Sequence, residues 1–97
     1  MKGQYFVYIT TNKTNNVLYT GFSSNLIKRI FQHKNKLASG FTSKYNVNKL
    51  VYFEVFLDPL EAIAREQQTK AGSRKKKLDL IKLTNPDFSE LYDQITS

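Results

Sequence analysis

The stretch that decides the fold is "VYITTNKTNNVLYTGF", residues 7–22. Residues 5–11, YFVYITT, are rich in β-branched and aromatic side chains, which is typical of a strand, and residues 17–22, VLYTGF, predict a second strand. Between them, NKTNN at residues 12–16 predicts a turn, because asparagine tolerates left-handed backbone conformations. The short link makes the two strands a hairpin.

Two tyrosines stand on either side of this turn, Tyr8 and Tyr19, and Gly21 follows the second one. A glycine inside a strand marks a bend or a close approach by another group, so Gly21 has a structural role. Strand tyrosines are most often packing residues with wet hydroxyls. The hairpin alone therefore leaves packing and chemistry both open for the two phenols.

Helical patterns and one further strand follow the hairpin. An apolar stripe predicts a helix from about residue 24 to 38, with Ser23 or Ser24 as its N-cap. The stripe comprises Leu26, Ile27, Ile30, Phe31 and Leu37. A polar loop then leads to a third strand, LVYFEVF, at residues 50–56.

The C-terminal half predicts two more helices and a basic segment between them. The first begins at Asp58 and Pro59 and ends near Ala71, with Gly72 as its stop signal. Ser73 caps a basic segment, RKKKLDLIKL, and a short last helix starts at Asn85 and Pro86. The expected fold is α+β in the order β-β-α-β-α-α: a small three-stranded, mainly antiparallel sheet flanked by helices, in a single domain over residues 1–97.

Composition narrows the classes of partner and compartment. The chain has no cysteine, which excludes disulfides and thiolate metal sites and suits a reducing compartment. No apolar run is long enough to span a membrane, and the N-terminus is too short and polar for a signal peptide, so a cytoplasmic protein is expected.

Charge is distributed unevenly along the chain, whose net charge is +7. Residues 1–53 contain eight Lys or Arg and no acid, whereas residues 54–97 contain seven Lys or Arg and all eight acids. Such a one-sided charge suggests an anionic partner, with nucleic acid as the first candidate. A solvated basic surface without a partner is the alternative.

The motifs and their order resemble the GIY-YIG endonuclease superfamily. Its first motif falls on Phe6-Val7-Tyr8 and its second on Tyr19-Thr20-Gly21, and NLIKRIFQH and EAIAREQQTK are similar to its two helices that bear catalytic residues. LVYFE, SRKKKLDLI and NPDF are similar to its small single-domain bacterial members. Phe6 and Thr20 depart from the motif letters, and KAGSRKKK lacks the bulky aromatic expected near Gly72.

The resemblance implies an active site and its ligands. The catalytic set would be Tyr8, Tyr19, Arg29, His33 and Glu66. Glu66 would hold a divalent cation, Mg²⁺ or Mn²⁺, because a carboxylate oxygen is a hard ligand and waters fill the remaining positions. Arg29 would grip a phosphate. Tyr8 is preferred as general base with Tyr19 as its partner, its pKa lowered by the metal and Arg29.

Each of these residues also has an ordinary structural interpretation. A helix arginine is usually a solvated charge, and His33, the only histidine, cannot form half of a two-histidine metal site. Glu66 is spaced to pair with Lys70 four residues on. Surface cations that could contact a nucleic-acid backbone are Lys28, Lys34, Lys44, Arg74, Lys75 and Lys76.

Three functions compete at this point. The first is a metal-dependent nuclease acting on DNA that is branched, damaged or single-stranded, in DNA repair or processing. With no attached recognition domain in the 97 residues, it would have weak sequence preference or rely on a targeting protein partner. The second is a non-catalytic nucleic-acid-binding module with the same fold, and the third is a protein-interaction domain with a basic surface.

Overall fold

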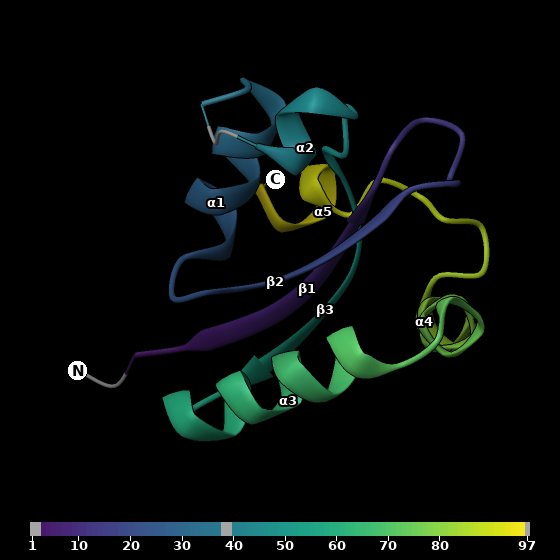
Figure 1. Ribbon diagram of the computed structural model, residues 1–97. Coiled ribbons are helices and arrows are strands. Elements are labelled where there is room, and N and C mark those ends of the chain that lie inside the picture. Colours follow the sequence, from purple (N-terminus) through teal and green to yellow (C-terminus); the bar gives the residue numbers. More distant parts are fainter. Residues whose placement is uncertain (1–2, 38–39, 97) are drawn as a thin grey trace.

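The computed structural model describes residues 3–37 and 40–96. Within these ranges the chain forms three strands and five helices in an α+β arrangement (Figure 1). In chain order they are β1 (Tyr5–Thr11), β2 (Leu18–Ser23), α1 (Leu26–Lys34), α2 (Phe41–Lys44), β3 (Lys49–Phe56), α3 (Pro59–Ala71), α4 (Arg74–Thr84) and α5 (Tyr92–Thr96).

The predicted three-stranded antiparallel sheet is confirmed, with the strand order β2-β1-β3. Strand β1 lies in the middle, and its residues 7–11 are all buried. The β1–β2 turn is closed by Asn12, whose side-chain oxygen accepts hydrogen bonds from the backbone N–H groups of Asn16 (3.0 Å) and Val17 (3.2 Å). Asn15 takes the left-handed conformation (φ 62°) that makes asparagine favourable here.

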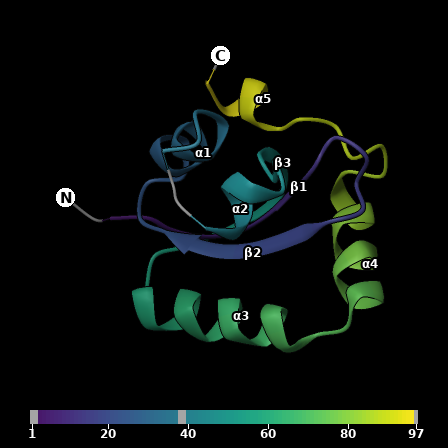
Figure 2. The same cartoon turned by 45° about the horizontal axis from the view of Figure 1, so that its top comes forward.

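Helices cover both faces of the sheet. Helices α1, α2 and α5 lie on one side and α3 on the other, while α4 lies at one end (Figures 1 and 2). The first face is filled by a cluster around Tyr8, Leu26, Ile30 and Leu50, with Leu91 and Tyr92 of the C-terminal segment packed against it. On the other side a second cluster joins Ile9 and Val51 to Ile81 of α4.

The helix after the hairpin differs from the prediction at both ends. Its N-cap is Asn25 rather than a serine, because the Asn25 side chain accepts the N–H of Lys28 (3.1 Å) while its own backbone stays extended. The helix ends at Lys34 rather than near residue 38, and residue 38 itself lies outside the described residues. Lys36 has φ 56°, which ends helical geometry.

The predicted apolar stripe of this helix is also wrong in part. Its buried residues are Leu26, Ile30 and His33, whereas Ile27 and Phe31 are 45% and 50% exposed. The helix is rotated so that a polar residue, His33, faces the sheet. A partner for its ring on the sheet makes this burial favourable.

Towards the C-terminus the signals at Gly72 and Ser73 are confirmed. Gly72 ends α3, and the Ser73 hydroxyl accepts the N–H of Lys76 to cap α4. The last helix starts at Tyr92 rather than at Asn85, because Asn85 instead ends α4 and its side chain donates to the carbonyls of Val51 (3.0 Å) and Ser89 (2.9 Å). A short helix, α2, forms where a loop was expected.

No helix in the described part of the chain is long and apolar enough to cross a membrane.

Candidate active site

Gly21 allows the Tyr8 ring to lie against the backbone of the neighbouring strand. The two residues are opposite each other in the β1–β2 register. A Cβ atom placed on Gly21 would stand 2.4 Å from the ring carbon Cζ and the hydroxyl of Tyr8, a distance at which atoms overlap. The position therefore requires glycine for space, in agreement with the close approach expected from the sequence.

Tyr19 lies on the same face of the sheet as Tyr8. It pairs with Thr10 in the register, which places the two tyrosines diagonally across the strands with ring centroids 6.3 Å apart. This face of the sheet is not open to solvent, however. Helix α1 covers it, Tyr8 is fully buried, and only Tyr19 is partly accessible. In so small a chain the Tyr8 ring is needed as core.

Arg29 and His33 lie one turn apart on α1, and both face the tyrosine hydroxyls. The His33 Nε2 atom is 3.0 Å from the Tyr8 hydroxyl, and its ring is 5.9 Å from that of Tyr19. The Arg29 guanidinium lies near both tyrosine hydroxyls and interacts with them electrostatically. Residues 8, 19, 29 and 33 thus meet in one place.

Burial controls the protonation of this cluster. Burial raises the pKa of Tyr8 to about 12, and it outweighs the hydrogen bond from Arg29, which lowers that pKa. Arg29 alone thus does not outweigh burial, and the lowering of the Tyr8 pKa by Arg29 together with a bound metal stays a prediction. Burial and the Arg29 charge lower the pKa of His33 to about 4, so its ring is neutral at pH 7.

The neutral ring of His33 completes a buried hydrogen-bond chain. Its Nδ1 atom is 3.0 Å from the Thr42 hydroxyl, and both side chains are buried. A neutral imidazole carries one ring proton, so His33 donates from one ring nitrogen and accepts at the other, with Tyr8 on Nε2 and Thr42 on Nδ1.

Glu66 approaches the same hydroxyls from the opposite side of the sheet. It belongs to α3, which runs beneath β2 in Figure 2. After burial, its charge is a further, small cause of the raised pKa of Tyr8; its hydrogen bond with Lys70, and to a smaller degree Tyr19, raises the pKa of Lys70. The two sides meet at β2, an edge strand. Glu66 also forms the expected ion pair with Lys70, 2.7 Å between Oε2 and Nζ.

The donor set fits only a cation that keeps most of its water. No group of three His, Cys, Asp or Glu side chains that could hold a metal occurs among residues 3–37 and 40–96. His33 is engaged at both ring nitrogens, which leaves the Glu66 carboxylate as the protein ligand near the tyrosines. A hydrated Mg²⁺ or Mn²⁺ bound through one carboxylate suits this chemistry, whereas a structural zinc site does not.

Comparison with protein families decides the affiliation of this chain. Residues 4–79 match the family model described as the GIY-YIG catalytic domain. The chain belongs to the GIY-YIG family. This is a nuclease family, whose members generally use divalent metals, and the resemblance found in the two tyrosine motifs is confirmed.

Relatives of similar size share this GIY-YIG domain. A UPF0213 protein from Staphylococcus saprophyticus is 38% identical over 78 residues, 80% of this chain and 94% of its own length. Another from Clostridium perfringens is 43% identical over 76 residues, 78% of this chain and 81% of its own length. The solution NMR structure of the UPF0213 protein BH0048 from Bacillus halodurans superposes with a TM-score of 0.57 at 28% identity, covering 90% of this chain and 92% of the other.

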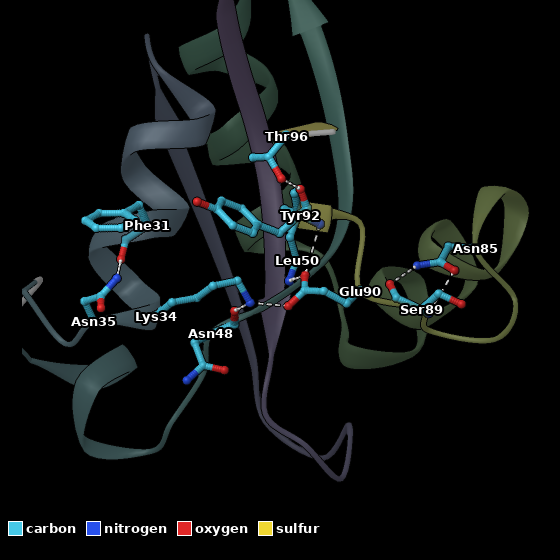
Figure 3. A network of polar contacts seen from close by, with 10 residues as sticks. All are labelled: Phe31, Lys34, Asn35, Asn48, Leu50, Asn85, Ser89, Glu90, Tyr92 and Thr96. Atoms are coloured by element: carbon cyan, nitrogen blue, oxygen red, sulfur yellow. Dashed lines mark hydrogen bonds and ion pairs between the residues drawn. The ribbon is translucent and has the colours of Figure 1, made fainter. Parts of the chain in front are cut away.

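One of the cations predicted to contact a nucleic-acid backbone, Lys34, instead forms contacts within this GIY-YIG domain. Lys34 forms an ion pair with Glu90, donates to the carbonyl of Asn48 (3.0 Å) and lies 5.1 Å from the centre of the Tyr92 ring (Figure 3). Glu90 in turn accepts the N–H of Leu50 (2.8 Å). Lys34 therefore fastens the C-terminal segment to the sheet, and its charge is already balanced.

The other predicted cations are more accessible. Lys28 and Lys44 are exposed on the side of α1 and α2, whereas the remaining three belong to α4 at the far end of the molecule. Of those, Lys75 pairs with Asp79 (2.8 Å) and Arg74 donates to the carbonyl of Asn15 (3.4 Å). Two separate basic surfaces result, one beside the candidate site and one on α4.

Sequence reasoning missed Thr42 as a member of the site. Thr42 lies in a stretch that was expected to be a loop, and no motif distinguishes it from the other hydroxyl residues there. Its contact with His33 exists because the chain folds back on itself between α1 and α2. Only the three-dimensional arrangement identifies it.

Proposed function

We propose that this chain is a divalent-metal-dependent nuclease that hydrolyses phosphodiester bonds in DNA. The observation that carries the proposal is the cluster of Tyr8, Tyr19 and His33, with Arg29 one turn before His33 on α1, in a chain of a nuclease family. The acid-free basic half of the sequence, residues 1–53, supports an anionic substrate. A role in the repair or processing of branched, damaged or single-stranded DNA would suit it.

Arg29 is the residue proposed to hold the scissile phosphate. No acid lies within ion-pair distance of its guanidinium in the described part of the chain, and it is only partly buried. A guanidinium can bind two phosphate oxygens at once and stabilise the charge that builds up on them during attack by water. The tyrosine hydroxyls hold its side chain in place.

Glu66 is the residue proposed to bind Mg²⁺ or Mn²⁺. When bound, such a cation polarises the phosphate and stabilises the leaving oxygen. Lys70 competes for the same carboxylate in the protein alone. Substrate would bring phosphate oxygens as alternative partners for Lys70, which would leave Glu66 for the cation.

Tyr19, rather than Tyr8, is better placed to orient the attacking water. Tyr8 is fully buried, is hydrogen-bonded to His33 and has a pKa raised to about 12 by that burial. Tyr19 is partly accessible, and it interacts with the same Arg29 guanidinium as Tyr8 does. Its hydroxyl can accept a hydrogen bond from a water molecule beside the phosphate. Tyr8, His33 and Thr42 then act as positioning residues for Arg29.

A plasmid-nicking assay with Mg²⁺ or Mn²⁺ tests the function. Arg29→Ala and Glu66→Ala are each expected to lower the cleavage rate by about 10²–10³-fold, as when a charge-stabilising group is removed from an active site. Glu61→Ala, on the same helix but exposed, is the matched control and should cut normally. Failure of the wild type to cut any form of DNA, with or without either metal, would refute the nuclease.

A non-catalytic nucleic-acid-binding module is the second candidate. The observation that favours it is the Glu66–Lys70 ion pair, which engages the carboxylate proposed for the metal. Salt-sensitive DNA binding without cleavage would establish it. A targeting protein partner would then be needed to account for any effect on DNA.

A further inference from the structure

A row of aromatic rings leads away from the candidate site over helix α2. It consists of Tyr19, Phe41 and Tyr45, which we call the aromatic row. The Tyr19 and Phe41 rings are stacked, with centroids 6.4 Å apart and planes inclined by 26°, and the Phe41 and Tyr45 centroids are 4.9 Å apart. The row begins at the tyrosine within reach of Arg29.

The row is exposed even though its rings contact one another. Phe41 is 46% and Tyr45 44% exposed, so each ring offers surface to solvent that the fold leaves uncovered. They lie four residues apart and hence on one side of the short helix. Thr42, between them in sequence, is buried against His33. Helix α2 thus ties the row rigidly to the buried hydrogen-bond chain of the site.

The charge around the row selects the kind of partner. Lys44 lies 5.4 Å from the centre of the Tyr45 ring, and the first 53 residues contain no acid. Exposed rings interleaved with cations are the combination that binds single-stranded nucleic acid, because bases stack on the rings while the cations attract the backbone. In a duplex the base faces are already stacked on one another and are not available.

We propose that the aromatic row binds unpaired bases of single-stranded DNA next to the phosphodiester held at Arg29. The inference rests on the proposed nuclease function, and it names the substrate class of that site. The enzyme would act on single strands, or on single-stranded segments of branched or damaged DNA. Intact duplex would bind weakly through charge alone.

Binding measured in EDTA tests the row independently of cleavage. Fluorescence anisotropy would compare a labelled 12-nucleotide single strand, the same sequence as a duplex, and an abasic strand of the same length. Wild type should bind the single strand about tenfold more tightly than the other two probes, the range expected for base stacking on aromatic rings. Equal affinity for the single strand and the abasic strand overturns the proposal.

Variants of the aromatic row test whether its rings cause the preference for the single strand. Phe41→Leu and Tyr45→Leu keep apolar bulk and should each weaken binding of the single strand about fivefold, with binding of the abasic strand unchanged. Phe31→Leu is the matched control, since Phe31 is 50% exposed on α1 and stands outside the row. Phe41→Trp and Tyr45→Trp should retain binding. The proposal is wrong if the variants of the aromatic row bind the single strand like wild type, or if Phe31→Leu loses as much affinity for it as they do.

Cleavage assays with the same variants separate the two proposals. If the protein prefers single strands through the aromatic row but never cuts them, the proposed nuclease activity is refuted and base binding by the row is supported. A protein that cuts DNA equally well with Phe41→Leu and Tyr45→Leu refutes the row and leaves the nuclease.

Discussion

Two networks in this protein each join a tyrosine to an arginine, and they differ in one respect. In the first, Arg29 reaches the hydroxyls of Tyr8 and Tyr19. In the second, Arg65 binds Glu54 through two hydrogen bonds of 2.9 Å, and Tyr52 donates its hydroxyl to the same carboxylate. Burial raises the pKa of Tyr8 and of Tyr52 to about 12 alike.

The carboxylate decides what each arginine can do. Arg65 is neutralised by Glu54, so the second network is a structural ion pair that links α3 to β3. Within residues 3–37 and 40–96 no carboxylate pairs with Arg29, which donates to the Gln32 amide oxygen (3.2 Å) and lies near the two phenols. A partly buried guanidinium without an acid is a site for an anion. The proposed phosphate contact follows from this difference.

Replacing each arginine with lysine should give the largest measurable difference between the two networks. Arg29→Lys is expected to lower DNA cleavage by about 10²-fold, because a lysine cannot bind two phosphate oxygens in one plane. Arg65→Lys should leave the cleavage rate unchanged and cost about 0.5–1 kcal/mol of stability, since water screens this partly exposed pair. Nicking rates and urea denaturation measure the two effects. Equal loss of cleavage in both variants would contradict the distinction.

The close approach at Gly21 should make the Tyr8 network sensitive to a single methyl group. Gly21→Ala places a Cβ atom 2.4 Å from the Tyr8 ring and should cost about 1–3 kcal/mol of stability through overpacking. Gly72→Ala is the control: its Cβ would meet backbone at 3.4 Å, an ordinary contact, and its φ of −70° suits alanine. Urea denaturation of both variants checks this. A Gly21→Ala protein as stable as wild type would show that the ring moves freely.

Acid should weaken the two networks in different pH windows. The folded-state pKa of His33, about 4, lies below its unfolded value of about 6.5, so the unfolded chain binds the extra proton and stability falls as the pH drops through that window. The slope should reach at most about 1.4 kcal/mol per pH unit. Burial opposes ionisation of Glu54, but hydrogen bonds from Arg65 and Tyr52 lower its pKa overall, so its contribution is lost only at lower pH.

An NMR titration measures the first window directly, because His33 is the only histidine. We expect its ring protons to titrate near pH 4 in the folded protein. A His33→Gln variant should flatten the dependence of stability on pH between about 4 and 6.5. A folded-state His33 pKa near its unperturbed value would mean that the buried chain from Tyr8 to Thr42 does not form.

Much of the fold can be predicted from local sequence patterns. The hairpin follows from alternating strand residues around an asparagine turn, and Gly72 with Ser73 separates two helices by capping chemistry alone. The helix after the hairpin was harder to place. Asn25 and the serines before it are all good caps, and the choice between them depends on how the chain leaves β2.

The membership of the candidate site stays a prediction from motif spacing, whereas its arrangement comes from the structure. Motif spacing suggested that Tyr8, Tyr19, Arg29, His33 and Glu66 belong together, and the structure brings the first four side by side with Glu66 approaching from across the sheet edge. Motif spacing did not indicate that Tyr8 is fully buried or that Thr42 joins the hydrogen-bond chain. Burial is set by α1 and α5 packing over the sheet, and such contacts join residues that are far apart in the sequence.

The sequence by itself determined the three strands, the family and the close approach of Gly21 to Tyr8, because these depend on neighbouring residues and on motifs of fixed spacing. Only the tertiary structure decided which arginine is left without an acidic partner. Arg29 and Arg65 both stand on amphipathic helices, and nothing in their local sequence distinguishes them. Glu54 comes to lie beside one and not the other because of how the helices pack on the sheet. Charge compensation is a property of neighbours in space.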